Sequence, residues 1–194
     1  CIQYLVLTED KYLQEDGLKY VMSPPLRTRK DCEALWMGIA KGDIQVVATD
    51  HCPFNYGKEK QLGKDDFTKC PNGAPGVEER ISLMFSEGVM AGRITLEQMV
   101  QVVSANPARI YGLYPQKGSL QPGADGDLII LDPTRERVLT HDQMHSAVDY
   151  TAYEGMKVKG AIDRVLLRGN VIMKNNQFLG KPGDGRFIFR SEER

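Results

Sequence analysis

The hydrophobic positions in the first part of the chain follow helical spacing and then one short, nearly continuous apolar run. Across residues 28–42, apolar side chains recur at helical intervals, which predicts an amphipathic helix. Thr28 and Asp31 have the spacing of an N-terminal capping box, and Gly42 is expected to end the helix. The run 44–49 is rich in β-branched residues and is typical of a strand covered on both faces. A helix followed by a buried strand predicts an α/β unit.

Two further helices are expected after a long polar loop. Residues 55–76 are rich in Gly, Lys, Asp and Pro, and long loops in compact domains usually carry function. Residues 77–88 then place apolar side chains on one helical face. A capping pattern at Thr95 begins another helix, which Pro107 is expected to interrupt before a last turn that stops at Gly112.

The pattern becomes β-rich after about residue 114. The stretch KGSLQPGADGDLIILDP leads through Gly and Pro into an apolar strand at 128–131. Later, RVLLRGNVIM has the pattern of two strands joined by a tight turn at Gly169 and Asn170. The chain is therefore expected to be α/β over residues 1–115 and mostly β beyond them.

Composition agrees with an ordinary globular protein. The 194 residues are 41% hydrophobic and 26% charged, with a formal net charge of −1, so bulk charge gives no case for nucleic acid or an anionic membrane as partner. No apolar run approaches the roughly 20 residues of a membrane-spanning helix. The four cysteines are widely separated, which argues against a zinc finger or a disulfide framework and favours a reduced, cytoplasmic setting.

Asp50 is the first candidate for chemistry, because it comes directly after the run 44–49. In α/β barrels the reactive groups lie at the C-terminal ends of strands, so a carboxylate there suits a metal ligand or a general base. The alternative is an Asp that only caps the next turn. Neighbouring side chains of an extended segment point in different directions, so His51 is expected to pack or to support another group instead of joining Asp50.

Other candidate residues carry weaker patterns. His141 and His145 are four residues apart, but no Glu lies between them in the protease pattern, which favours a surface or packing role. Cys52 is expected to be a small buried hydrophobe, since no basic neighbour would lower the pKa of its thiol. The loops MSPPLR (22–27) and KCPNGAPGVEER (69–80) either present backbone groups to a ligand or serve only as connections.

Several motifs in a fixed order resemble one family. MSPPLR, TDHCPF, GKDDFTKCPNGAPGVEER, PQKGSLQPGADGDLIILDP and AVDYTAYEGMKVKG resemble the C-terminal part of the cyclic amidohydrolases, most closely the dihydropyrimidinase/D-hydantoinase family. The resemblance implies an α/β fold, namely the C-terminal part of a metal-dependent (β/α)8 TIM-type barrel followed by part of a β-sandwich domain. The expected domains are the barrel portion at 1–115, the β-sandwich part with its connecting segment at 116–180, and a C-terminal tail at 181–194.

The same resemblance implies an activity and a site. The expected reaction is hydrolytic ring opening of cyclic amides, such as 5,6-dihydropyrimidines and hydantoins, by a hydroxide that two divalent ions activate, zinc being expected. Asp50 corresponds to the aspartate that binds metal and shuttles the proton. Ser23 and Asn72 match the positions whose backbone groups hold the cyclic amide. The family also implies a homotetramer, and its bridging carbamylated lysine lies outside this chain.

Most metal ligands of that family have no counterpart here. The sequence has three histidines, none in a His-x-His pattern, and all of them follow Asp50. A barrel typically needs about 250 residues. The chain is therefore expected to be a C-terminal fragment that is inactive alone, holds metal poorly and exposes apolar faces that favour aggregation.

Two alternatives stay open. Another cyclic amidohydrolase, such as an allantoinase or a dihydroorotase, would share the metal chemistry and the Asp, although DFTKCPNGAPGVEER favours the dihydropyrimidinase/hydantoinase side. The collapsin response mediator proteins share the fold but act as non-catalytic scaffolds, and they have lost metal ligands that include the aspartate. Because TDHCPF keeps Asp50, the sequence favours an enzyme.

Overall fold

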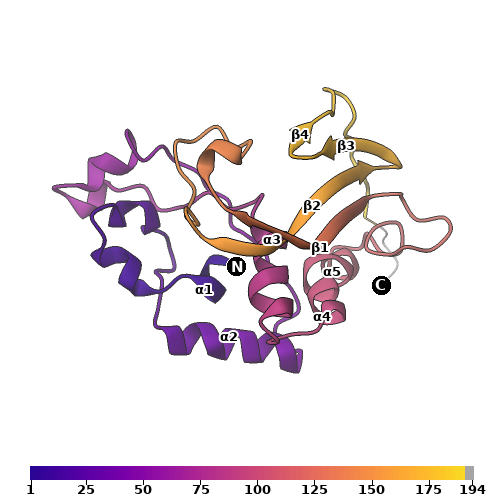
Figure 1. The fold of residues 1–194 in the computed structure, drawn as a ribbon, viewed down its shortest axis with the longest axis horizontal. Helices are drawn as coiled ribbons and strands as arrows, with labels where there is room; N and C mark the ends of the chain where they lie inside the picture. The colour runs from indigo at the N-terminus through magenta and orange to yellow at the C-terminus, as the bar shows by residue number, and fades with distance from the viewer. Residues whose placement is uncertain (191–194) are drawn as a thin grey trace.

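The computed structural model describes residues 1–190, in which helical elements and loops come first and an antiparallel sheet follows (Figure 1). The α-helices are α1 Gln3–Val6, α2 Arg29–Lys41, α3 Arg80–Leu83, α4 Leu96–Val100 and α5 Asn106–Ile110, and the strands are β1 Leu128–Val138, β2 Lys157–Leu167, β3 Asn170–Lys174 and β4 Gln177–Phe178. Shorter 3-10 turns cover Glu9–Leu13, Gly17–Tyr20, Lys60–Gly63, Phe67–Lys69 and His141–Gln143, and π-helical segments cover Met84–Met90 and Gln101–Ala105.

The longest helix, α2, has the ends that the sequence predicts. The N–H of Thr28 donates to the carboxylate of Asp31 at 3.0 Å, and the N–H of Asp31 donates back to the Thr28 hydroxyl at 3.4 Å. Gly42 follows the helix with a left-handed φ of 83°, as is common where helices end. The buried face of α2 carries Trp36, whose indole N–H donates to the carbonyl of Leu5 at 3.0 Å. The predicted capping box and C-terminal glycine are confirmed.

The helical runs 80–90 and 96–110 lie where the hydrophobic spacing predicts helices. Thr95 and Gln98 form the second capping box, with the N–H of Thr95 donating to the Gln98 side chain at 2.8 Å. The run continues without a gap from α4 through a π-helical segment into α5. Pro107 lies in the first turn of α5, where backbone N–H groups have no partner within that helix. The expected interruption is therefore wrong: the hydrogen-bonding pattern changes there, but the helix does not break.

The apolar run 44–49 is not a strand, contrary to expectation. Its backbone makes isolated bonds instead of a ladder: the N–H of Val47 donates to the carbonyl of Val102 at 3.0 Å, and the carbonyl of Ala48 accepts from Ile2 at 3.1 Å. A strand requires a neighbouring strand with continuous pairing, and within residues 1–190 none pairs with this run. Val47 is buried, but Ala48 is exposed, so the run is not covered on both faces either.

The sheet has the order β1-β2-β3-β4 with every neighbouring pair antiparallel. The predicted hairpin is confirmed, but its turn lies one residue earlier than expected. Arg168 and Gly169 occupy the turn with positive φ values of 47° and 81°, and Asn170 already pairs with Leu167 as the first residue of β3. Two positive φ values are typical of the tight turn that suits the twist of a hairpin.

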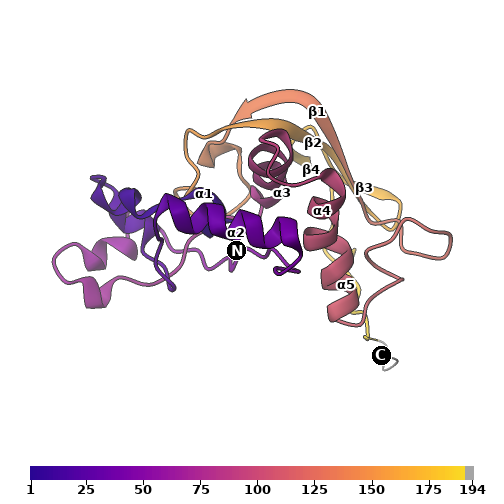
Figure 2. The same cartoon turned by 90° about the horizontal axis from the view of Figure 1, so that it is seen from below.

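The sheet and the helices share a core. Strand β2 packs against α3 and the π-helical segment that follows it, and the sheet lies over α3, α4 and α5 in both views (Figures 1 and 2). One cluster of buried side chains joins the first part of the chain to the segment between β1 and β2; among its members are Ile2, Leu26, Trp36, Val47, Leu83, Leu139 and Tyr153. In residues 1–190, no helix has both the length and the apolar character needed to cross a membrane.

Candidate functional site

Three backbone segments that are far apart in the sequence lie side by side. We call them the Ser23 loop (21–27), the Asp50 segment (48–52) and the Asn72 loop (70–76). The N–H of Gly73 donates to the carbonyl of Val21 at 3.1 Å, which joins the Asn72 loop to the Ser23 loop. The N–H of Cys52 donates to the carbonyl of Ala74 at 3.2 Å, which joins the Asn72 loop to the Asp50 segment. The structure therefore brings together the segments of all three predicted site residues.

Gly73 allows this close approach. A Cβ atom at this position would lie 2.4 Å from the carbonyl oxygen of Cys52, and the φ of Gly73 is +149°. Any other residue would push the Asn72 loop away from the Asp50 segment and would strain its own backbone. The Asn72-Gly73 pair is thus a point of contact between two parts of the site.

Asp50 lies at the junction of these segments. Its side chain is exposed, and within residues 1–190 it forms no hydrogen bond and no ion pair. The φ of Asp50 is +52°, a conformation that is uncommon for residues other than glycine and that Asp and Asn adopt more readily than most. Unusual backbone conformations of this kind are often found at functional sites.

Tyr4 connects Asp50 to the Ser23 loop. Its hydroxyl donates to the carbonyl of Pro24, next to Ser23, at 2.7 Å. Burial raises the pKa of the Tyr4 phenol, and the negative charge of Asp50 raises it further. The phenol therefore stays neutral and remains a hydrogen-bond donor. The sequence analysis missed Tyr4, because a tyrosine in an apolar stretch carries no local sign of a neighbour 20 residues away.

Ser23 and Asn72 are both exposed, each on its own loop. The bond between Gly73 and Val21 places the two loops in contact, and the Asn72 loop also borders the Asp50 segment through Ala74. Their predicted role, holding a cyclic amide with backbone groups, stays a prediction.

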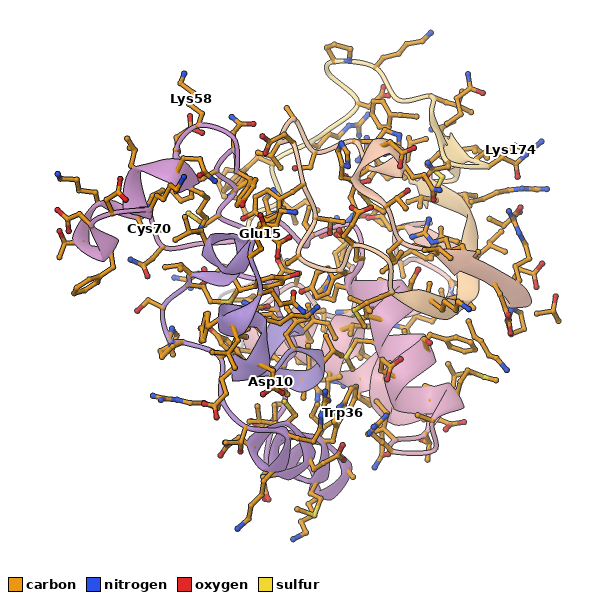
Figure 3. The ribbon with its side chains drawn as sticks, turned by 60° about the vertical axis from the view of Figure 1, so that its left-hand side comes forward. Asp10, Glu15, Trp36, Lys58, Cys70 and Lys174 are labelled. Atoms are coloured by element: carbon orange, nitrogen blue, oxygen red, sulfur yellow. The ribbon has the colours of Figure 1, made fainter. Side chains whose placement is uncertain are left out.

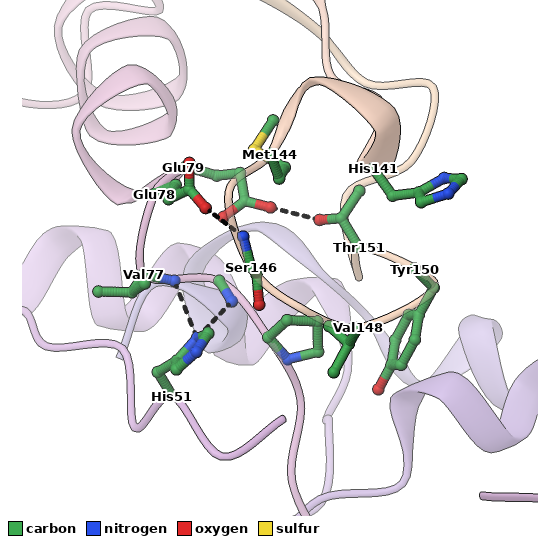
Figure 4. Close-up of a pocket in the computed structure, with 12 residues that line it drawn as sticks. His51, Val77, Glu78, Glu79, His141, Met144, Ser146, Val148, Tyr150 and Thr151 are labelled. Atoms are coloured by element: carbon green, nitrogen blue, oxygen red, sulfur yellow. Dashed lines mark hydrogen bonds between the residues drawn. The ribbon is translucent and has the colours of Figure 1, made fainter. Parts of the chain in front are cut away.

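His51 has the supporting role that was expected. Its Nδ1 accepts from the N–H of Gly76 at 3.2 Å and from the N–H of Val77 at 3.3 Å, as the close-up shows (Figure 4). Two backbone N–H groups thus occupy the Nδ1 side of the ring. Since the ring is engaged with the backbone after the Asn72 loop, it does not join Asp50 in one cluster.

The pocket beside His51 joins the helical part of the chain to the segment between β1 and β2 (Figure 4). Burial raises the pKa of the Glu79 carboxyl, which bonds to the hydroxyl of Thr151. Glu78 accepts from the backbone N–H groups of His145 at 2.7 Å and Ser146 at 2.9 Å. Both carboxylates are hydrogen-bonded within the protein. The pocket therefore holds the two segments together and offers few free polar groups for binding a cyclic amide.

The remaining candidates divide into one confirmed and one wrong expectation. His141 and His145 are exposed on a turn and a loop, where they lie 3.8 Å from Glu154 and 2.9 Å from Glu78, so their surface role is confirmed. Cys52 is exposed and not buried, contrary to expectation. Its backbone faces the Asn72 loop, which leaves the residue at the rim of the site. No cysteine of residues 1–190 forms a disulfide.

The sequence did not predict two polar side chains that hold the long loop 55–76: Lys60, which lies in it, and Asp149, which binds it. Lys60 is completely buried, and its amino group donates to the carbonyls of Val21 at 2.7 Å and Pro71 at 2.8 Å. The carboxylate of Asp149 accepts from the N–H groups of Tyr56 at 2.6 Å and Gly57 at 2.8 Å. A lysine in a polar, lysine-rich stretch has the pattern of a solvated residue, so no local signal could have identified Lys60.

The described residues provide few of the ligands that a metal centre needs. Within residues 1–190, no three His, Cys, Asp or Glu side chains gather in a way that could hold a metal ion. Asp50 offers one free carboxylate, which is a suitable ligand for zinc, but a catalytic zinc takes about three protein ligands. Asp50 therefore fits one ligand position, and these residues do not by themselves fit a two-metal centre.

Comparison with known proteins gives consistent relatives. The sequence model described as "Amidohydrolase family" matches residues 4–172. A D-phenylhydantoinase of Escherichia coli is 51% identical over 190 residues, which cover 98% of this chain and 41% of the relative. The chain thus spans less than half the length of the curated relatives that it matches.

Solved structures give the same result. A dihydropyrimidinase from Brevibacillus agri superposes with a TM-score of 0.96 at 44% identity, over 98% of this chain and 42% of that one. An L-hydantoinase (dihydropyrimidinase) from Arthrobacter aurescens superposes with a TM-score of 0.90 at 34% identity, over 97% of this chain and 42% of that one.

Proposed function

We propose that this chain, which belongs to the amidohydrolase family, contributes the Asp50 side of an active site that opens cyclic amide rings by hydrolysis. The observation that carries the proposal is the direct joining of the Ser23 loop, the Asp50 segment and the Asn72 loop around a free carboxylate. Relatives named D-phenylhydantoinase and dihydropyrimidinase support hydantoins and 5,6-dihydropyrimidines as the substrate class.

The finer architecture belongs to the same proposal. Residues 1–115 would form the last part of a (β/α)8 barrel, residues 116–180 part of a β-sandwich, and residues 181–194 a tail, of which residues 191–194 lie outside the described part. The high TM-scores to much longer dihydropyrimidinase and hydantoinase chains support this division. The complete protein would be a cytoplasmic homotetramer, and the free cysteines of residues 1–190 are consistent with a reduced setting.

The proposed chemistry assigns a distinct task to each segment. Water adds to the ring carbonyl carbon, a C–O bond forms, and the C–N bond of the ring breaks, which leaves a carboxylic acid and a free ureido or amide nitrogen. The acid then releases its proton to solvent and becomes a carboxylate. A carboxylate oxygen of Asp50 accepts a proton from the attacking water and passes it to the departing nitrogen. Backbone groups of Ser23 and Asn72 bind the flat ring and hold it in the site in the ground state and in the transition state alike.

Metal ions would complete this site. Proteins of the amidohydrolase family generally bind divalent metal ions, which supply a Lewis acid for the carbonyl oxygen and lower the pKa of water. Asp50 is the residue of this chain that we propose as a ligand, with zinc as the expected metal. The other ligands would come from parts of the complete protein outside residues 1–190.

A substrate profile of the complete protein tests the proposal. Purified protein with its metal content determined is assayed for ring opening of dihydrouracil, hydantoin, allantoin and dihydroorotate, before and after treatment with a chelator. We expect turnover of dihydrouracil and hydantoin that is lost on chelation and restored by zinc. Turnover of allantoin or dihydroorotate alone would indicate another cyclic amidohydrolase. A metal-loaded protein that opens none of the four rings would overturn the enzymatic proposal and favour a scaffold protein.

A further inference from the structure

Lys60 is a buried cation in a position where a core built only for stability would carry an apolar side chain. Its exposed fraction is 0%, although the lysine lies in a loop with exposed lysines on either side, Lys58 and Lys64. Burial lowers the pKa of its amino group, which reflects the cost of removing a charge from water. Such a cost is sustained only when the buried group makes compensating hydrogen bonds.

The two partners of Lys60 belong to the two loops of the proposed substrate site. Its Nζ donates to the carbonyl of Val21 at 2.7 Å and to the carbonyl of Pro71 at 2.8 Å. Val21 lies two residues before Ser23, and Pro71 lies directly before Asn72. Since the carbonyl of Val21 also accepts from the N–H of Gly73, the amine and one backbone bond together join the loops.

The surroundings of Lys60 exclude a direct role in the reaction. The amine lies 5.9 Å from the centre of the Phe54 ring, a suitable distance for a weak cation–π contact. Within residues 1–190 it forms no ion pair with a carboxylate. A side chain with no exposed surface cannot touch a substrate, so any influence of Lys60 on the reaction must act through the two loops.

We propose that Lys60 is a positioning residue that holds the Ser23 loop and the Asn72 loop at the spacing at which their backbone groups bind one ring. This inference rests on the proposed function. Contacts to the bound ring through both loops are present in the ground state and in the transition state alike, so losing their alignment weakens both equally. The expected signature is therefore a higher KM with a nearly unchanged kcat.

The test compares Lys60→Met with Lys58→Met in the complete protein. Both changes replace a lysine by an apolar residue of similar length, but Lys58 is exposed and points away from the fold (Figure 3). For Lys60→Met we expect KM for hydantoin and dihydrouracil to rise by about 10- to 100-fold, as misplaced binding groups cause. The kcat should stay close to that of the wild type, and Lys58→Met should change neither constant.

Two other results would overturn the inference. An unchanged KM in Lys60→Met would show that the loops keep their spacing without the amine. A loss of kcat with an unchanged KM would place Lys60 among the groups that act on the transition state only.

A second variant separates positioning from folding. Lys60→Gln keeps N–H donors on a shorter side chain that can reach one carbonyl, and we expect its KM to lie between those of the wild type and Lys60→Met. If neither Lys60 variant folds while Lys58→Met does, Lys60 is a requirement of the core and the positioning role is refuted.

Hydrogen exchange gives a readout that does not depend on activity. The N–H of Gly73 is bonded to the carbonyl of Val21, so its exchange reports directly whether the two loops stay joined. We expect faster exchange at Gly73 in Lys60→Met and wild-type exchange in Lys58→Met. If the wild type opens no ring while this difference holds, the proposed function fails and the loop coupling stands. If the wild type is active and Gly73 exchange is unchanged, the coupling fails and the function stands.

Discussion

The ends of helix α2 are held in place by interactions between neighbouring residues, whereas the three joined loops are held by contacts between residues far apart in the sequence. The ends of α2 depend on Thr28, Asp31 and Gly42, all of which lie within or next to the helix. The loops depend on side chains from distant positions: the amine of Lys60 binds a carbonyl of the Ser23 loop 39 residues away. In the polar loop that follows the Asp50 segment, an N–H binds the carboxylate of Asp149, 93 residues away.

This difference separates stability from function. Losing a local cap removes free energy from one helix and leaves the geometry of the loops intact. Losing a long-range polar contact releases one loop from another, so the proposed substrate site loses its alignment before the fold loses its stability. Substitutions at the cap of α2 should therefore change only the thermal midpoint, whereas substitutions in the loop contacts should also loosen the loops, which hydrogen exchange or kinetic constants detect.

The largest expected effect is at the junction of the loops. In the complete protein, Asp50→Asn should lower kcat by about 10²- to 10⁴-fold, because an amide cannot accept the proton and is a poorer metal ligand. The thermal midpoint of the metal-free protein should change little, since the Asp50 side chain is exposed and unpaired within residues 1–190. Steady-state kinetics with hydantoin and a thermal melt give both values. A kcat close to that of the wild type would refute the role of Asp50.

The second effect is at the contact between Asp149 and residues 56 and 57. Asp149→Asn should release residues 56 and 57, with faster hydrogen exchange at the N–H groups of Tyr56 and Gly57. Weakening two hydrogen bonds to a charged acceptor should cost about 1–2 kcal/mol of stability. Asp142→Asn serves as the control, because Asp142 is an exposed carboxylate that bonds only within its own turn. Equal exchange rates in the Asp149 variant and the wild type would show that the loop is held by other means.

The same contact predicts a pH dependence. Burial tends to raise the pKa of the Asp149 carboxyl, but the N–H groups of Gly57 and Tyr56 outweigh it, and the pKa is lowered. A lowered pKa in the folded state means that this stabilisation is fully present above the ordinary Asp pKa of about 3.9 and is lost as the pH falls through the lowered value. The difference in thermal midpoint between the wild type and Asp149→Asn should therefore be constant near neutral pH and shrink below about pH 4. A difference that grows on acidification would contradict this assignment.

The local side of the comparison predicts a change in stability alone. Thr28→Ala removes the cap of α2 and should cost about 1 kcal/mol, with KM and kcat unchanged. Thr28→Ser keeps the hydroxyl and should behave like the wild type. Chemical denaturation together with steady-state assays would detect any kinetic effect, and such an effect would show that α2 is coupled to the loops after all.

The smallest effects are expected at the side chains of the proposed binding residues. Ser23→Ala and Asn72→Ala should change kcat/KM by no more than about two- to threefold, the range of exposed substitutions that leave the backbone intact. A loss as large as that of Asp50→Asn would mean that these side chains, and not their backbone groups, contact the ring.

The sequence predicted most of what depends on neighbouring residues. The capping boxes at Thr28 and Thr95, the stop at Gly42 and the β-hairpin near Gly169 all involve groups within a few positions of one another, and the structure confirms them. Ordered motifs also identified the family, because several motifs in one order are far more specific than any one of them.

The failures have a common cause. The run 44–49 has the composition of a strand, but a strand exists only where another strand pairs with it, and residues 1–190 contain none that does. Pro107 was expected to break a helix, and the preceding π-helical segment changes the bonding pattern so that the helix continues. Cys52 is exposed although its backbone bonds to the Asn72 loop, and no local pattern encodes either fact.

By itself, then, the sequence determined the helices with their caps, the hairpin and the family, and it proposed the carboxylate of Asp50 as a site residue. Only the tertiary structure decided that Lys60 is buried, that Asp149 holds residues 56 and 57, and that the Ser23 and Asn72 loops meet. Local elements follow from short-range hydrogen bonding, which a sequence pattern expresses directly. The position of a polar side chain in a loop depends on which distant carbonyl or N–H the folded chain brings within reach, and that is a property of the packing as a whole.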